Sequence, residues 1–333
     1  MSRHILGIDG GGTHTRAAIL NETGKLLGVG LGGPTNYDDI GIEATRDNLR
    51  QVINSAWQAA GLMPQPFAAA FLGLAGIVSA DDHRIIRQIT YELNLAPEAQ
   101  VGIDHDCRIA LAGSLSGRAG IVLIAGTGSA CYGRTAAGHS WRAGGWGDLL
   151  ADEGSGGWLG WQAMRAAVRS FDGRERPSRL VNDILDLFEL RHMNDIMHRI
   201  YHVGLSRKER AALAPLVMTA ARDNDEIAQQ LIHEAVEELA LSVWAVAHQL
   251  EMHAQPEITI VGGLYNVEEL FAAPLRTAIR NKLPGCHIQP PELSPVIGAC
   301  LLALQQIGVD PQTISLALKA SEKALKAILN KRQ

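Results

Sequence analysis

Apolar runs separated by glycine turns dominate the start of this chain. A largely apolar run at 5–8 leads into Asp9 and three glycines, and a second segment, apolar at 17–20, follows at 15–20. Turn-forming residues then precede a third segment at 25–29, which is largely apolar after its first residue. This pattern predicts three strands, with the glycines at the tip of a hairpin and not at the start of a helix.

The rest of the chain alternates between short apolar runs and segments with helical spacing. Apolar runs of four to eight residues predict strands, and recurrence at i, i+3 and i+4 predicts helices. Strands are expected at 67–74, 100–103, 120–125, a return strand from 129 and 258–261, and helices at 38–60, 81–93, 158–171, 178–189, 207–224, 225–254 and 313–331.

The glycine turns have the chemistry of a phosphate site. Glycine allows backbone N–H groups to approach an anion closely, and a carboxylate at a strand end can hold Mg²⁺, through water. The first turn supplies Asp9 with Gly10, Gly11, Gly12 and Thr13. An ordinary glycine-rich hairpin is the alternative. The spacing fits neither the dinucleotide fingerprint nor a P-loop.

Two further glycine turns follow apolar strands later in the chain. The segment around residues 120–133 repeats the order of strand, glycine turn and return strand found at the start of the chain, which suggests a duplicated domain. Its turn consists of Gly126, Thr127, Gly128 and Ser129. A bare backbone at Gly262-Gly263 could lie against a flat adenosine, or could be a plain strand-to-helix turn.

Composition excludes several classes of protein. The 333 residues suffice for two domains, and 47% hydrophobic content suffices for a core in each. A net charge of -5 without a long basic block argues against nucleic acid as the main partner. We find no long apolar span and no basic-then-apolar leader, so we expect a soluble, cytoplasmic protein without a membrane partner.

Cysteine and histidine spacing gives no metal motif. The four cysteines form no C-x-x-C pair, so a cysteine-ligated iron-sulfur cluster is not expected. His198 and His202 stand four apart on an expected helix, but no glutamate completes H-E-x-x-H. We interpret them as surface or packing residues.

The ordered set of motifs resembles the N-acetylglucosamine kinase branch of the BadF/BadG/BcrA/BcrD ATPase family, within the sugar kinase, Hsp70 and actin superfamily. No single motif decides this, but their order covers residues 5 to about 304. The motifs are Asp9-Gly-Gly-Gly-Thr13, Leu72-Gly73-Leu74-Ala75-Gly76, Asp106, Gly126-Thr127-Gly128-Ser129, Gly144-Gly145-Trp146-Gly147-Asp148, Asp152-Glu153-Gly154-Ser155 and Gly262-Gly263.

The resemblance implies an α/β fold of two RNase H-like domains that close on a nucleotide. We expect residues 1–116 with 306–333 in one domain and 117–305 in the other. It also implies ATP and Mg²⁺ as cofactors, a free sugar as substrate, and a homodimer. The segment 294–301 resembles the second connecting helix of the family.

The activity implied is transfer of the γ-phosphoryl group of ATP to a sugar hydroxyl, with O6 of N-acetylglucosamine as the first choice. Asp106 matches the aspartate that takes the hydroxyl proton in the resembled kinases. This chain has His105-Asp106 where Asn-Asp is usual, preceded by Asp104, so either carboxylate can be the base. A further alternative is that Asp106 only caps the following helix.

Sugar contacts in the resembled kinases match residues of two segments of this chain. The matching residues are Asn36, Gly145, Trp146 and Asp152, with Asp106, Thr127 and Gly128 also facing the substrate. Trp141 and Trp146 could instead be packing aromatics.

Other functions stay open at this point. Glucosamine or another hexose could be the substrate, because discrimination depends on pocket shape. An ATPase that activates a partner enzyme and a sugar-binding regulator without catalysis are the alternatives from other classes.

Overall fold

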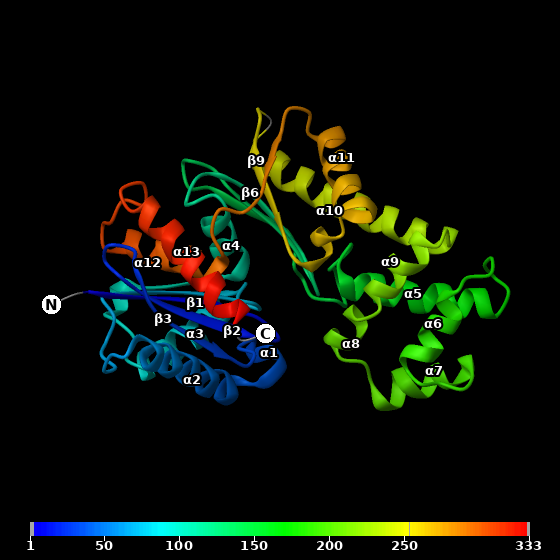
Figure 1. The fold of residues 1–333 in the computed structure, drawn as a ribbon, viewed down its shortest axis with the longest axis horizontal. Coiled ribbons are helices and arrows are strands. Elements are labelled where there is room, and N and C mark those ends of the chain that lie inside the picture. The colour runs from blue at the N-terminus through cyan, green and yellow to red at the C-terminus, as the bar shows by residue number, and fades with distance from the viewer. Residues whose placement is uncertain (1–2, 253, 332–333) are drawn as a thin grey trace. The chain divides into compact units, whose positions relative to one another are not determined.

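Two compact units divide the chain in the computed structural model, which describes residues 3–252 and 254–331 (Figure 1). The first unit contains the residues up to Ala119 together with those from Pro290 onward, and the second is Gly120–Gln289. The second unit is therefore an insertion in the sequence of the first.

The sheet of the first unit has five strands in the order β3-β2-β1-β4-β5. β1 pairs antiparallel with β2, and β2 with β3, whereas β1, β4 and β5 run parallel. The carboxyl ends of these three parallel strands therefore lie at one edge of the sheet. The strands are β1 (His4–Gly10), β2 (Thr15–Asn21), β3 (Leu26–Gly32), β4 (Ala69–Leu74) and β5 (Val101–His105).

Side chains of β1 point alternately to the two faces of the sheet and contribute to two hydrophobic cores. Leu6 and Ile8 pack in a core with α2 and α3, and Ile5 packs in another with α4, α12 and α13. Figure 1 shows α2 on one side of the strands and α12 and α13 on the other. The helices are α1 (Tyr37–Ile40), α2 (Ile42–Ala60), α3 (Ala80–Glu92), α4 (Asp106–Ser114), α12 (Pro295–Gln306) and α13 (Ser315–Asn330).

The sheet of the second unit repeats this topology. Its order is β10-β9-β6-β7-β8, with β6, β7 and β8 antiparallel and β6, β9 and β10 parallel. The two glycine hairpins thus occupy equivalent positions, as a duplicated domain requires. The prediction of two α/β units is confirmed. The strands are β6 (Gly120–Ala125), β7 (Ser129–Arg134), β8 (Ser140–Gly144), β9 (Glu257–Val261) and β10 (His287–Gln289).

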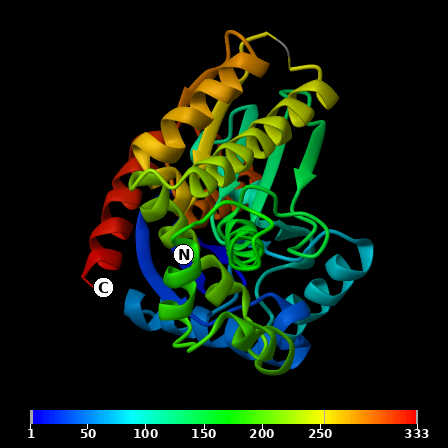
Figure 2. The ribbon, with the colours of Figure 1, turned by 90° about the vertical axis from the view of Figure 1, so that its right-hand side faces the viewer.

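Helices make up most of the second unit. The long helix α10 packs on β6 and β7, and Figure 2 shows it running across these strands. Its buried face joins α5, α9 and α11 in one large core. The helices are α5 (Gly156–Phe171), α6 (Leu180–Leu187), α7 (Ile196–His198), α8 (Arg207–Ala211), α9 (Ala214–Arg222), α10 (Glu226–Gln249) and α11 (Ala273–Lys282), with short turns at Met193–Asp195, Arg199–Val203, Gly263–Asn266 and Glu268–Ala272.

Two expected helices are each divided in the structure. The segment 38–60 breaks at Gly41, which has a φ of 83° and ends α1. The segment 207–224 divides into α8 and α9, and Pro215 lies in the first turn of α9, where its missing N–H costs nothing. Each difference follows from the backbone chemistry of a single residue, Gly41 in the first segment and Pro215 in the second.

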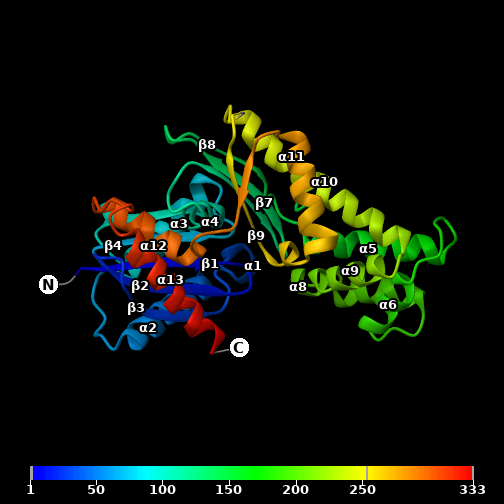
Figure 3. The ribbon, with the colours of Figure 1, turned by 45° about the horizontal axis from the view of Figure 1, so that its top comes forward.

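The contact division also differs from the expected domain boundary. Residues 290–305 belong to the first unit, whereas the sequence analysis assigned them to the second. The reason is α12, which packs on α4, β1 and β4 (Figure 3). Gly298 permits this approach, because a Cβ there would lie 2.2 Å from the carbonyl oxygen of Ile109.

His198 and His202 are exposed, as expected for surface residues, and their rings stack with centroids 5.2 Å apart. They lie on α7 and the following turn. Among the described residues, no helix combines the length and the apolar character needed to cross a bilayer.

Candidate functional site

The turn between β1 and β2 carries the first predicted phosphate site. The Gly11 N–H donates to the His14 carbonyl at 3.0 Å, which closes the turn and leaves Gly12 and Thr13 exposed. A Cβ on Gly10 would lie 2.2 Å from the Thr35 hydroxyl oxygen, so this position requires glycine. The turn is therefore fixed at its base and open at its tip.

Asp9 is a carboxylate with an unusual charge environment. Burial raises its pKa to about 6; the Arg16 guanidinium, 3.6 Å away, opposes this rise and Asp106 adds to it. Its side chain is still 19% exposed. A hard cation would favour the ionised form, and Mg²⁺ prefers carboxylate and water oxygens. The Asp9 carboxylate therefore fits a magnesium ion held through water.

Asp104 and Asp106 flank the end of β5, at the same sheet edge as Asp9. In register across the parallel strands, Asp9 pairs with Gly73, and Gly73 pairs with Asp104. The N-cap of α4 is His105, whose ring nitrogen accepts from the Arg108 N–H. The alternative reading of Asp106 as the helix cap is therefore wrong. Asp106 is the first residue of α4.

Asn36 lies in the loop after β3 and caps the short helix α1. Its side-chain oxygen accepts from the Asp38 N–H, and its amide donates to Asp39 at 2.9 Å. A Cβ on Gly76 would lie 2.4 Å from the same Asn36 oxygen. A Cβ on Gly12 would lie 3.3 Å from an Asp39 oxygen. The structure therefore places Asn36 close to the loop after β4 and links it through Asp39 to the first predicted phosphate turn.

The second predicted phosphate turn, between β6 and β7, is joined to the start of α5. The Gly126 N–H donates to the Gly128 carbonyl at 3.0 Å, and Gly156 and Gly157 donate to the Gly126 and Thr127 carbonyls. Thr127 is exposed at the tip. This turn is thus held by a helix N-terminus that the sequence analysis did not connect with it.

Asp152 lies directly against this turn. It is 4% exposed and has a φ of 64°, unusual for a non-glycine residue. One carboxylate oxygen accepts from the Ser129 N–H at 3.3 Å, and a Cβ on Gly128 would lie 2.8 Å from the other. The structure therefore brings together Asp152, Gly128 and Ser129, which were predicted separately.

The predicted sugar residues Gly145 and Trp146 follow β8 on an exposed loop. Gly144 and Gly145 have φ values of 70° and 69°, which glycine adopts readily. Trp146 is 61% exposed, and the Arg142 guanidinium lies 4.7 Å from its ring centroid. Arg142 also donates to the Gly145 carbonyl at 2.7 Å. An exposed indole in this position suits stacking on a sugar more than core packing. Trp141 is also exposed, at 47%.

Two arginines of α8 were missed by the sequence analysis. Arg207 forms ion pairs with Asp152 at 2.9 Å and with Asp148 at 3.8 Å. Arg210 is also hydrogen-bonded to Asp148. Only the density of charge at the start of α8 could have signalled them, because their partners lie far away in the sequence.

Gly262 and Gly263 follow β9, beside the end of β6. Gly262 has a φ of 116°, and a Cβ there would lie 2.2 Å from the Ala125 carbonyl oxygen. Gly263 has no atom within 4 Å of a built Cβ. Gly262 is thus needed for packing against the second predicted phosphate turn, whereas Gly263 leaves an open face.

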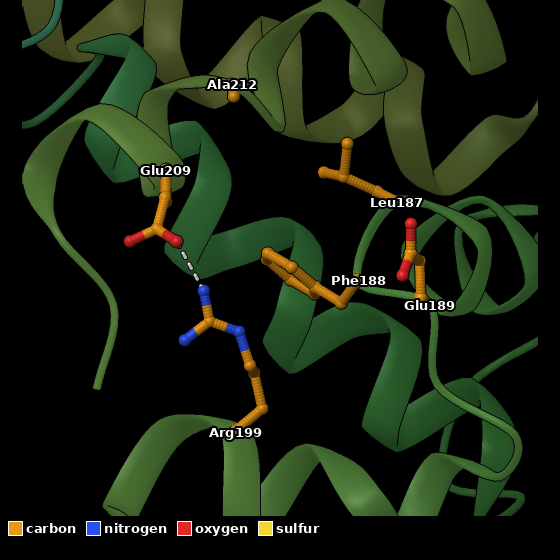
Figure 4. A pocket seen from close by; sticks show the side chains of 6 residues that line it. All are labelled: Leu187, Phe188, Glu189, Arg199, Glu209 and Ala212. Carbon is orange, nitrogen blue, oxygen red and sulfur yellow. Dashed lines mark hydrogen bonds and ion pairs between the residues drawn. The ribbon is translucent and has the colours of Figure 1, made fainter. Parts of the chain in front are cut away.

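A small pocket elsewhere in the second unit contains none of the predicted site residues (Figure 4). Arg199 points toward Glu209 across it, and the two side chains form an ion pair. Glu209 also accepts from Ser206 at the start of α8. This contact fixes the helix that carries Arg207. The pocket is lined by Leu187, Phe188, Glu189, Arg199, Glu209 and Ala212.

Comparison with known proteins gives consistent results. The profile of the BadF/BadG/BcrA/BcrD ATPase family matches residues 6–303. The N-acetylmuramic acid/N-acetylglucosamine kinase of Clostridium acetobutylicum is 33% identical over 302 residues, which are 90% of this chain and 98% of that protein. The N-acetyl-D-glucosamine kinase of Dictyostelium discoideum is 27% identical over 91% of this chain and 99% of its own length.

A solved structure shares the fold over nearly its whole length. It is a Chromobacterium violaceum protein provisionally described as an N-acetylglucosamine kinase. The TM-score is 0.72 at 29% identity, with 91% of this chain and 99% of that chain covered.

Proposed function

Because the chain belongs to the BadF/BadG/BcrA/BcrD ATPase family, we propose that it is an ATP-dependent amino-sugar kinase whose preferred sugar is N-acetylglucosamine. The observation that carries this proposal is the repeated strand, glycine turn and strand, present at equivalent positions of both sheets. Kinase relatives that align along nearly their whole length support it.

ATP phosphates are the ligands proposed for both glycine turns. The backbone of Gly10, Gly11 and Gly12 with Thr13 serves one turn, and Gly126, Thr127, Gly128 and Ser129 serve the other. Exposed turn N–H groups suit anionic oxygens. The open face at Gly263, beside Gly262, is assigned to the adenosine.

Asp9 is the proposed holder of Mg²⁺, through water. The ion would neutralise charge on the phosphate oxygens. Asp9 itself supplies a carboxylate whose ionised form a cation would favour, since burial has raised its pKa to about 6.

Asp106 is the proposed base. The oxygen of the sugar 6-hydroxyl forms a bond to the γ-phosphorus, the bond from that phosphorus to the β,γ-bridging oxygen breaks, and ADP leaves. The hydroxyl proton passes to Asp106. Orientation matters more than basicity here, because the proton transfers late in such reactions. Asp104 is the alternative base at the same sheet edge.

Sugar binding is assigned to Asn36, Gly145, Trp146 and Asp152. Carboxylate and amide groups pair with hydroxyls, and the exposed indole offers a flat apolar surface. The relative from C. acetobutylicum is named for N-acetylmuramic acid as well as N-acetylglucosamine, so both sugars belong in the substrate test.

An assay of ADP release with a panel of sugars tests this proposal. We expect turnover only when a sugar is present, with N-acetylglucosamine preferred over glucosamine and glucose, and NMR of the product should show phosphate on O6. If the rate of ATP hydrolysis does not change with any sugar but increases with a partner protein, the activator alternative is favoured. The proposal includes a homodimer, which light scattering of the purified protein would detect.

A further inference from the structure

Arg207 joins the proposed sugar site to the proposed phosphate turn. It is the first residue of α8, and a capping box between Ser206 and Glu209 fixes the start of that helix. Its terminal nitrogen donates to an Asp152 oxygen at 2.9 Å. Its side chain is 39% exposed, whereas that of Asp152 is only 5% exposed.

Asp152 is held from two sides by different elements. Its first oxygen accepts from Ser129 on β7, and its second accepts from Arg207 on α8. The Gly128 backbone lies against the same pair, because a Cβ there would be 2.8 Å from the Asp152 oxygen and 3.2 Å from the Arg207 nitrogen. No side chain at Gly128 separates the ion pair from the turn.

We propose that Arg207 is a positioning residue that keeps the Asp152 carboxylate ionised and oriented toward a hydroxyl of the amino sugar. This inference rests on the proposed function, because it takes Asp152 as a sugar ligand. An ionised carboxylate only accepts hydrogen bonds, whereas a protonated carboxyl group carries an O–H that must itself donate one. Loss of ionisation would therefore weaken recognition of a sugar hydroxyl donor.

Burial works against this ionisation. Burial raises the pKa of Asp152 above its usual range, the Ser129 N–H and Arg207 lower it, and Asp148 raises it further. Asp148 is itself paired with Arg210 and, at longer range, with Arg207. Removal of Arg207 should raise the pKa of Asp152 more, so the proton is taken up at a higher pH.

The variant Arg207→Met keeps the length of the stem and removes the charge. We expect the KM of this variant for N-acetylglucosamine to rise when the pH is lowered from 8 to 6. The ratio of KM at pH 6 to KM at pH 8 should be about tenfold larger than in the wild type, and kcat should change by about twofold or less. Arg207→Lys retains a charge and should recover part of this loss. Calorimetry of sugar binding without nucleotide should show the same pH dependence in Kd.

Lys208→Met is the matched control. Lys208 is the next residue of α8 and is exposed, so its variant removes the same charge from the same helix and should behave as the wild type. Circular dichroism checks that each variant folds. If Arg207→Met does not fold, Arg207→Gln takes its place. The same rise in KM at low pH is expected of that variant.

Carbon-13 NMR titration of the Asp152 carboxyl, assigned with Asp152→Asn, tests the inference without any sugar. A higher pKa in the Arg207 variants supports it. An unchanged pKa, or a KM ratio that does not vary with pH, would overturn it. Failure of the wild type to phosphorylate any amino sugar would instead refute the proposed function, so the two failures are distinguishable.

Discussion

At the residue scale, the junction where α4 directly follows β5 separates two roles that the sequence could not tell apart. His105 caps the helix, so the carboxylate of Asp106 is not needed for that purpose. One Asp106 oxygen accepts from the adjacent Cys107 N–H at 2.8 Å, which orients the carboxylate. Asp104 contacts the His105 N–H at 2.8 Å. Both carboxylates thus accept from the N–H of the residue that follows them, and Asp104 also lies 3.6 Å from the His105 ring nitrogen, so variants of the two residues decide which is the base.

Replacing Asp106 by Asn should lower kcat by about a hundredfold or more, because a positioned base typically contributes that much. Sugar binding should survive, since Asn keeps the shape and one acceptor oxygen. Steady-state kinetics and calorimetric sugar binding measure the two effects. Asp104→Asn is the matched comparison, and if it is inactive while the Asp106 variant works, the assignment moves to Asp104.

Most of the predicted site residues follow from local chemistry. Asp9 and the glycine turns were found because a carboxylate and bare backbone adjoin an apolar strand in the sequence itself. Arg207 was missed because it is 55 residues from Asp152, and a pairing at that distance leaves no local pattern. The positive φ of Asp152 was likewise not predicted.

At the scale of elements, the parallel pair β6 and β9 determines how closely a glycine turn approaches another strand end. Gly262 lies against Ala125 and Gly126 at the end of β6 with no space for a side chain. Its neighbour Gly263 begins a short 3₁₀ turn with an open face. Adjacent glycines therefore have different physical roles.

The pair Gly262→Ala and Gly263→Ala tests this difference. Gly262→Ala should destabilise the protein by about 2 kcal/mol or more, because it combines a strained φ with a clash. Gly263→Ala should leave the stability nearly unchanged and raise the KM for ATP. Urea unfolding and kinetics measure the two effects. Equal loss of stability in both variants would refute the distinction.

Prediction of the elements failed where periodicity was weak. β8 carries exposed and half-buried residues without clean alternation, and it was not expected. A helix after Asp106 was considered, but no bounds were predicted for it, because α4 is buried on nearly all sides and lacks the apolar stripe that marks a surface helix. α2 was found because its buried positions repeat with helical spacing. Tertiary packing determines the elements that were missed.

At the scale of the whole molecule, each hydrophobic core belongs to a single unit. The largest core uses residues between Ile121 and Ile288 only. Of the two cores of the first unit, one uses only residues that precede this insertion, and the other uses residues on both sides of it. The repeated strand order was predictable in outline from the repeated hairpins, whereas the assignment of α12 depended on contacts with β1 and β4 that are distant in sequence.

The segment Gly120–Gln289 should fold when expressed alone, because its core needs no residue from outside it. Circular dichroism should show native-like helix content and a cooperative thermal transition. A segment 1–119 is the comparison, and it should not fold by itself, since it lacks α12 and α13. A cooperative transition in 1–119 but not in 120–289 would contradict this view of the cores.

The interrupted sequence of the first unit has a consequence for biosynthesis. Ile5, Ala18 and Leu20 emerge from the ribosome before the inserted unit, but their packing partners in α12 and α13 are translated after it. The inserted unit can complete its folding in the meantime, while an apolar face of the first sheet waits uncovered. Nascent chains should therefore be most exposed to chaperones and to aggregation until α12 and α13 have emerged.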